Sequence, residues 1–113
     1  MNLNTKTVDN VIVVDFAGKI DFQLSIDFEI ELNEIIQKEP EKHFLFNLEE
    51  VEYMDSSGIR LFIATSRILE KANRKLKLCN MNSSIKMIFR VIKLIDMFEI
   101  FESEVEALAS FNK

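Results

Sequence analysis

Apolar and polar positions along the first third of the chain predict two strands and then a helix. Apolar residues recur within the segments 3–8 and 11–17, and the pair Asp9-Asn10 between them tolerates the geometry of a tight turn. We expect these segments to form a β-hairpin. Farther along, apolar residues recur at helical spacing and stop before Pro40, which predicts an amphipathic helix of about four turns. The residues of this stripe are Leu24, Phe28, Leu32, Ile35 and Ile36.

The middle of the chain predicts a buried strand that leads directly into a second helix. The segment 44–48 is almost entirely apolar, as expected of a central strand covered on both faces. The helical pattern starts at Ser57 and has two faces. The expected core face consists of Gly58, Leu61, Phe62, Thr65, Ile68, Leu69 and Ala72. The other face is largely basic and consists of Arg60, Ile63, Arg67, Glu70 and Arg74.

Two groups of side chains on the predicted helices have either a bland or a functional interpretation. The basic face of the second helix is either a solvated surface or a contact for a partner. Ile26 and Ile30 lie opposite the apolar stripe of the first helix. They are either ordinary exposed residues or a second partner contact.

The last third of the chain predicts a strand, a third helix, a short strand and a final helix. Asn73 is expected to end the second helix in a left-handed turn, before a strand at 75–79. Asn82 or Ser83 then begins a helix with two apolar stripes. One stripe is Ile85, Ile88, Phe89, Ile92 and Ile95; the other is Met87, Val91, Leu94 and Phe98.

That second stripe is more apolar surface than covering one sheet face requires, so we expect it to pack against the last helix or another subunit. A short strand is expected at 100–102. The final helix is expected to open with a capping box from Ser103 to Glu106.

The order of these elements defines the expected fold class. Strands that alternate with helices after an opening hairpin predict an α/β protein, with helices packed on a small mixed sheet. We expect about five strands and about four helices. The 113 residues suffice for a single domain spanning 1–113, without repeats or linkers.

Composition removes several classes of function. A net charge of −5 argues against direct nucleic-acid binding, which needs clustered Lys and Arg. No apolar run approaches the roughly 20 residues of a membrane span, and the N-terminus lacks the apolar stretch of a signal peptide, so we expect a cytoplasmic protein. One histidine and one cysteine cannot build the usual zinc sites. Cys79 is interpreted as a small buried residue, and no internal disulfide can form.

The segment Tyr53–Arg60, YMDSSGIR, carries the most informative chemistry. It places an acid, two hydroxyls and a glycine where the apolar run gives way to the helical pattern. If the strand ends at Asp55 and the helix starts at Ser57, Ser56 is the N-cap, beside backbone N–H groups that lack a helical partner. Such a position accepts phosphate readily. The alternative is that DSSG is only a capping turn.

Ser56 is better suited to accept a phosphoryl group than to act as a nucleophile. A hydrolytic serine needs a base within reach, and a G-x-S-x-G elbow is absent from the sequence. His43 is expected at the opposite end of its strand from the loop that leads to Ser56. A phosphoacceptor needs only an exposed hydroxyl, because the kinase supplies nucleotide, magnesium and base. The sequence therefore predicts a protein that is not an enzyme.

Three segments resemble the STAS domain of bacterial anti-sigma-factor antagonists, or anti-anti-sigma factors, over essentially the whole chain. They are GKID at 18–21, FLFNLEEVEYMDSSGI at 44–59 and NSSIKMIFRVIKLIDMF at 82–98. The DSSG part is the specific one. The resemblance implies a small mixed sheet carrying about four helices. We expect no cofactor, and the composition argues against a metal site.

The resemblance also implies a mechanism. In this family the serine after the motif aspartate, here Ser56, is phosphorylated by the partner anti-sigma factor, a serine kinase. The unphosphorylated antagonist binds the kinase and frees a sigma factor, phosphorylation releases the antagonist, and a PP2C-type phosphatase restores it. Phosphorylation adds a charge of about −1.5 to −2, which can change the binding of the partner without refolding the antagonist. The residues expected at the partner interface are Asp21, Asp55, Ser56, Ser57, Gly58, Arg60, Ile63 and Arg67.

Individual roles follow from the same resemblance. Asp55 is expected to shape the turn and add negative charge, and Gly58 to leave room for the kinase. Asp21 matches a family aspartate at the same end of the sheet, or is only a helix cap. Family members often read SGLG, whereas here Arg60 replaces the second glycine. Leu94-Ile95-Asp96 stands where Ser-Gly or Thr-Gly is common. These departures from the family pattern bear on which partner is bound more than on the fold.

Two other functions are compatible with a STAS domain. One is an accessory subunit of an ABC-type transporter, which binds an ATPase domain without a phosphorylation cycle. The other is a regulatory scaffold in a larger stress-signalling complex. A homodimer is compatible with each of these interpretations.

Overall fold

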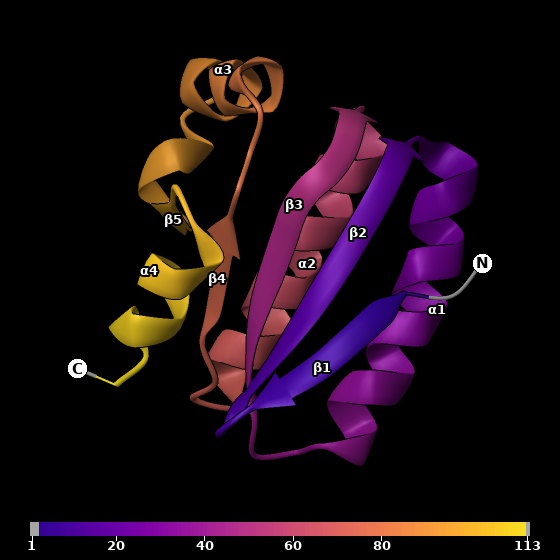
Figure 1. Cartoon of the computed structure of the whole chain (residues 1–113). Coiled ribbons are helices and arrows are strands. Elements are labelled where there is room, and N and C mark those ends of the chain that lie inside the picture. Colours follow the sequence, from indigo (N-terminus) through magenta and orange to yellow (C-terminus); the bar gives the residue numbers. More distant parts are fainter. Residues whose placement is uncertain (1–2, 113) are drawn as a thin grey trace.

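The computed structural model describes residues 3–112, and its helices and strands alternate as the sequence predicts (Figure 1). The hairpin strands are β1 (Asn4–Val8) and β2 (Val11–Ile20), and the remaining strands are β3 (His43–Met54), β4 (Leu76–Cys79) and β5 (Glu99–Phe101). The helices are α1 (Phe22–Lys38), α2 (Ser56–Lys71), α3 (Ser83–Val91) and α4 (Glu104–Ser110), with a short 3-10 helix, η1 (Leu94–Asp96).

The sheet is mixed, which confirms the expected fold class. Its order is β1-β2-β3-β4-β5, with β1 antiparallel to β2 and all later neighbours parallel. Asp9 has a φ of 54°, which allows the predicted tight turn between β1 and β2. Since β2 and β3 are parallel, the helices that follow them begin at the same edge of the sheet, the upper edge in Figure 1.

Helices cover the two sheet faces unequally. The main core lies between the sheet and α1 and α2, and Phe16 packs there against Phe46 and Phe62 with ring centroids 4.7 and 5.3 Å away. On the opposite face, α4 covers a smaller cluster. Its buried members are Val11, Val13, Leu45, Cys79 and Ala107. Both faces of the central strand β3 are therefore buried along its first half, as its apolar run indicates.

Arg74 does not belong to the solvent-facing basic stripe that the periodicity predicted. Helix α2 ends at Lys71, and Asn73 takes the expected left-handed conformation with a φ of 59°. This turn directs Arg74 into the protein, where it is buried. Its guanidinium donates hydrogen bonds to the carbonyl oxygens of Ile36, Glu39 and Lys42. Arg74 thus satisfies backbone acceptors at the C-terminal end of α1.

Helix α3 is shorter than its apolar pattern suggested. It ends at Val91, and Lys93 is left-handed with a φ of 64°, so the chain turns before η1. The turn brings Leu94 and Phe98 into the main core, whereas Met87 and Val91 stay exposed. The four residues therefore do not form one stripe, and the expectation was wrong on that point because it assumed an uninterrupted helix. Packing of the exposed Met87 and Val91 against another subunit stays a prediction.

Both helix caps and the burial of Cys79 agree with the sequence interpretation, whereas the position of Ile68 does not. Asn82 caps α3 by accepting a hydrogen bond from the Ile85 N–H, and Ser103 caps α4 through the Glu106 N–H. Cys79 is buried, and burial raises the pKa of its thiol to about 12. Ile68, expected in the core, is instead half-exposed.

None of the helices within residues 3–112 combines the length and the hydrophobicity that a membrane crossing requires.

Candidate functional site

Asp55, rather than Ser56, caps helix α2. The Asp55 backbone is extended, and its carboxylate Oδ1 accepts hydrogen bonds from the N–H groups of Ser57 at 2.8 Å and Gly58 at 3.4 Å. An aspartate carboxylate is a strong cap, so the helix starts one residue earlier than expected. Ser56 is consequently the first helical residue and is exposed. Because Asp55 satisfies the capping positions, the Ser56 hydroxyl is not needed for that role.

Asp21 occupies the equivalent position on the neighbouring helix. Its carboxylate caps α1 by accepting a hydrogen bond from the Leu24 N–H at 3.0 Å. Ile20 pairs with Met54 in the sheet, so the two aspartates that follow them leave adjacent strands at the same edge. The Asp55 N–H also donates to the Ile20 carbonyl at 3.2 Å. The expectation that Asp21 lies at the same end of the sheet as the DSSG segment is confirmed, and so is its capping role.

Gly58 is needed inside the protein. It is buried, and a Cβ built on it would lie 2.6 Å from Met54 Cγ and 2.9 Å from Ile20 Cγ2. Both distances are shorter than real Cβ contacts, so a side chain would push α2 away from the strand ends. The sequence interpretation assigned this glycine to kinase access. In the structure, its own chain occupies the space that a side chain would need.

The remaining predicted residues follow one another along α2. Arg60 and Arg67 are exposed, and they lie on the same side of the helix because they are seven residues apart. Ile63 lies between them but is only partly exposed, because it packs against the main core. The structure therefore brings the DSSG residues together with Asp21 and Arg60, while Arg67 lies about two turns farther along α2.

A groove runs between α1 and α2 beside this edge, and we call it the α1–α2 groove. Its volume is about 210 Å³, and its lining residues are Phe22, Ser25, Ile26, Glu29, Ser57, Arg60, Leu61 and Ala64. Sequence reasoning singled out Ile26 but missed Phe22. The signal was present, since Phe22, Ile26 and Ile30 are spaced by four residues away from the core stripe of α1.

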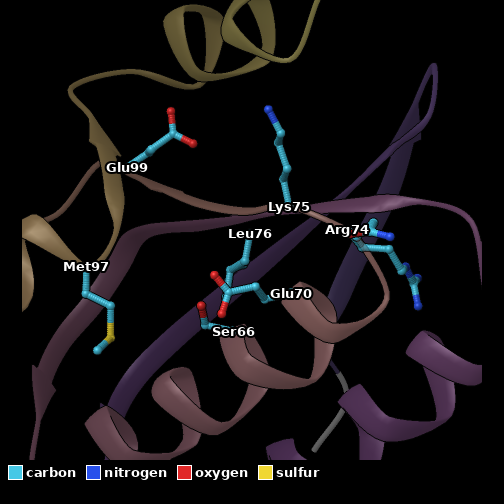
Figure 2. A pocket seen from close by; sticks show the side chains of 8 residues that line it. Ser66, Glu70, Arg74, Lys75, Leu76, Met97 and Glu99 are labelled. Carbon is cyan, nitrogen blue, oxygen red and sulfur yellow. The ribbon is translucent and has the colours of Figure 1, made fainter.

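A larger hollow lies near the opposite end of α2 (Figure 2). Its volume is about 490 Å³, and Ser66, Glu70, Lys75 and Glu99 contribute polar side chains to its wall. The Arg74 guanidinium there is already bound to backbone carbonyls. Within residues 3–112, no buried side-chain polar atom lacks a partner, so none points to a missing ligand in this hollow. We therefore assign the candidate site to the edge that holds Ser56.

His43 lies far from this site along the sheet. It begins β3, whereas Ser56 follows the end of that strand, so they stand at opposite ends as expected. Its Nδ1 accepts a hydrogen bond from the Lys75 N–H at 2.9 Å, and burial is the main cause that lowers its pKa. The histidine joins β3 to the start of β4 and is not placed to activate Ser56. Across residues 3–112, no group of three or more His, Cys, Asp or Glu side chains is arranged to hold a metal ion.

The fold and this strand-to-helix site are those of a STAS domain. The STAS family model matches residues 2–107, and the chain belongs to that family.

Among curated relatives, the chain is similar to the anti-sigma-B factor antagonist of Staphylococcus aureus, with 29% identity over 110 residues that cover 94% of this chain and 98% of the relative. It is also similar to the anti-sigma F factor antagonist of Paenibacillus polymyxa, with 24% identity over 102 residues, covering 90% and 87% of the two chains. Among solved structures, the phosphorylated form of the Bacillus cell fate determinant SpoIIAA has a TM-score of 0.76 at 20% identity, covering 97% of this chain and 99% of SpoIIAA. At that identity, the last similarity shows the fold alone.

Proposed function

We propose that this chain is an anti-sigma factor antagonist that acts through a serine phosphorylation switch. In this proposal, residues 1–113 form one STAS domain that binds an anti-sigma factor serine kinase and thereby frees a sigma factor. Phosphorylation of Ser56 by that kinase releases the antagonist, and a PP2C-type phosphatase restores it. The chain itself is a binding protein and not an enzyme.

The position of Ser56 is the observation that carries this proposal. Its hydroxyl stands on the first turn of α2, exposed and free of the capping role that Asp55 fills. A phosphate at the N-terminal end of a helix is stabilised by the helix dipole and the first N–H groups, so this chain can carry the modification without unfolding. The names of the two bacterial relatives support the same function.

The same geometry explains how a phosphate would release the partner. Asp21 and Asp55 already place two carboxylates at this edge of the sheet. A phosphate of charge about −1.5 to −2 on Ser56 adds to them and enlarges the side chain at the centre of the proposed interface. A partner surface that fits the free hydroxyl is then repelled by the negative charge and sterically excluded by the larger side chain.

Phosphorylation with the anti-sigma factor kinase of the same organism tests the proposal. We expect peptide mapping to place the phosphate on Ser56, Ser56→Ala to abolish it, and Ser57→Ala, the matched control, to retain it. Ser56→Ala should bind the kinase permanently, and Ser56→Asp should bind at least about tenfold more weakly, a difference of about 1.4 kcal/mol. Phosphate confined to Ser57, or equal affinities of the Ala and Asp variants, contradicts the proposal.

A further inference from the structure

The α1–α2 groove has one apolar wall that nothing in the fold covers. Phe22 and Ile26 on this wall are 64% and 37% exposed, and Ile30, which is 57% exposed, continues their row one turn farther along α1, beyond the residues that line the groove. Side chains at that spacing form one continuous row on a helix. Three large apolar side chains in a row form a larger apolar surface than single exposed residues do, and the row begins at Phe22, beside the Ser56 edge.

The α2 side of the groove continues this surface and adds positive charge. Ile68 is 49% exposed, and it follows the groove residue Ala64 by four positions, one turn farther along α2. Arg60 lines the groove, and Arg67 follows it by seven positions on the same side of the helix. The four ion pairs within residues 3–112 involve neither arginine.

These features define the chemistry of an occupant. A groove between two helices whose lining includes Phe22, Ile26, Leu61 and Ala64 suits an amphipathic helix that presents apolar anchors at i, i+3, i+4 and i+7. Two unpaired arginines on the α2 rim favour carboxylates on the same flank of that helix, because charge complementarity selects and steers a partner. Glu29 lies on the α1 wall, so the acidic flank is expected to face α2 and not α1.

We propose that the α1–α2 groove receives an amphipathic helix of the partner kinase, with its apolar face on Phe22, Ile26, Ile30 and Ile68 and its acidic flank on Arg60 and Arg67. This inference rests on the proposed function and identifies the part of the kinase that is recognised. A chain with a net charge of −5 thus attracts an acidic segment through a local basic rim.

The groove also gives phosphorylation a second way to release the partner. Ser56 lies four residues before Arg60, a spacing at which side chains on a helix meet. A phosphate on Ser56 repels the acidic flank, and it also forms a charge-assisted contact with the Arg60 guanidinium that the flank would otherwise use. On phosphorylation, Arg60 therefore loses its contact with a carboxylate of the partner helix and gains one with the phosphate on Ser56.

Binding of purified kinase to groove variants tests the inference. Ile26→Asp and Arg60→Glu should each weaken binding at least about tenfold, because each places a negative charge where the acidic helix docks. The matched controls are Val105→Asp on α4 and Arg90→Glu on α3, both exposed residues outside the groove. They should change the affinity less than about twofold. Circular dichroism confirms that all four variants fold.

A photoreactive amino acid in place of Ile30 then identifies the occupant. After irradiation with the kinase, we expect mass spectrometry to find one cross-linked segment with helical apolar spacing and Asp or Glu on one flank. The same label at Val105 should not cross-link. If the kinase binds wild-type protein and phosphorylates Ser56 but the groove variants bind equally well, or the cross-linked segment is basic or extended, the groove inference is wrong while the proposed function stands. If the kinase neither binds nor phosphorylates the wild-type chain, both are wrong.

Discussion

Gly58 fits the first turn of α2 against the strand ends so closely that no side chain can be added without movement. Its absent Cβ would lie 2.6 Å from Met54 Cγ and 3.3 Å from the Ile20 carbonyl oxygen. In an uncrowded helix, Gly→Ala stabilises by roughly 0.5–1 kcal/mol. Here we expect Gly58→Ala to destabilise by about 1–3 kcal/mol, because overpacking shifts the helix or Met54. Urea unfolding measures the change.

A double-mutant cycle identifies the cause of that loss. Met54→Ala removes the side-chain atom nearest to the added Cβ, so Gly58→Ala should cost less in the Met54→Ala background than in the wild type. A gain in stability for Gly58→Ala alone would show that the site has room for a side chain. The glycine of the DSSG segment would then need a different explanation, such as contact with a partner.

Arg74 connects the C-terminal end of α1 to the turn between α2 and β4. It donates to the carbonyl of Lys42 at 2.7 Å and to that of Ile36 at 3.3 Å. Its guanidinium also lies 5.5 Å from the ring centroid of Phe44. Because a buried carbonyl without a donor costs about 1–3 kcal/mol, we expect Arg74→Met to destabilise the protein by about 2 kcal/mol or more.

Arg67→Met is the matched control for this prediction. The same change on the exposed face of α2 should alter the free energy of unfolding by less than about 0.5 kcal/mol. Thermal or urea unfolding of the two variants supplies the comparison. Equal effects would mean that the hydrogen bonds from Arg74 to the carbonyls at the end of α1 add no more stability than the side chain of an exposed arginine does.

The elements that sequence reasoning located well are those whose signal is local. The cap at Ser103, the left-handed turn at Asn73 and the end of α1 before Pro40 depend on neighbouring residues alone. The features that were predicted wrongly depend on residues outside the segment in which they lie. Periodicity placed Arg74 on the exposed side of a helix, whereas the turn at Asn73 and the open carbonyls of α1 decide its position.

The candidate site shows the same division. The sequence identified the DSSG edge, Asp21 and the exposed arginines, because residue types and spacing alone reveal strand-to-helix junctions and the faces of helices. It missed the groove, since a groove exists only once two helices pack side by side. It also missed Phe22, although the four-residue spacing of Phe22, Ile26 and Ile30 was a signal for it. It also placed the helix start one residue late, because competition between Asp55 and Ser56 for the cap depends on the strand geometry before them.

In the whole molecule, α4 joins the two ends of the chain across the second sheet face. Glu104 accepts hydrogen bonds from Lys6 Nζ on β1 at 2.7 Å and from Asn47 Nδ2 on β3 at 2.9 Å. The hydrogen bond from Lys6 is the main cause that lowers the pKa of Glu104. Asp15 lies nearby, and burial followed by the charge of Glu104 raises its pKa. The two carboxyls therefore have opposite effects on the pH dependence of stability.

The sign follows from these shifts. A carboxyl whose pKa is lowered by folding stabilises the native state above its ordinary pKa, and this contribution is lost as the pH falls through the lowered value. Asp15 acts in the reverse direction, because its raised pKa disfavours the charged native form near neutral pH and acid relieves that cost. Glu104 thus adds to the acid sensitivity of the fold, and Asp15 reduces it.

Glu104→Gln removes the contribution of the Glu104 carboxylate. The free energy of unfolding should therefore fall less steeply as the pH is lowered. The Lys6 side chain is largely exposed, so we expect a loss of only about 0.5–1 kcal/mol at pH 7. The difference from wild type should shrink as the pH falls through the lowered pKa of Glu104, because the wild-type carboxylate is then protonated as well. Urea unfolding at several pH values measures both quantities, with Glu34→Gln on the exposed surface of α1 as the control. A difference that stays constant over the whole acid limb of the wild-type curve would mean that Glu104 holds α4 through packing rather than through its charge, and that the attachment of α4 does not depend on pH.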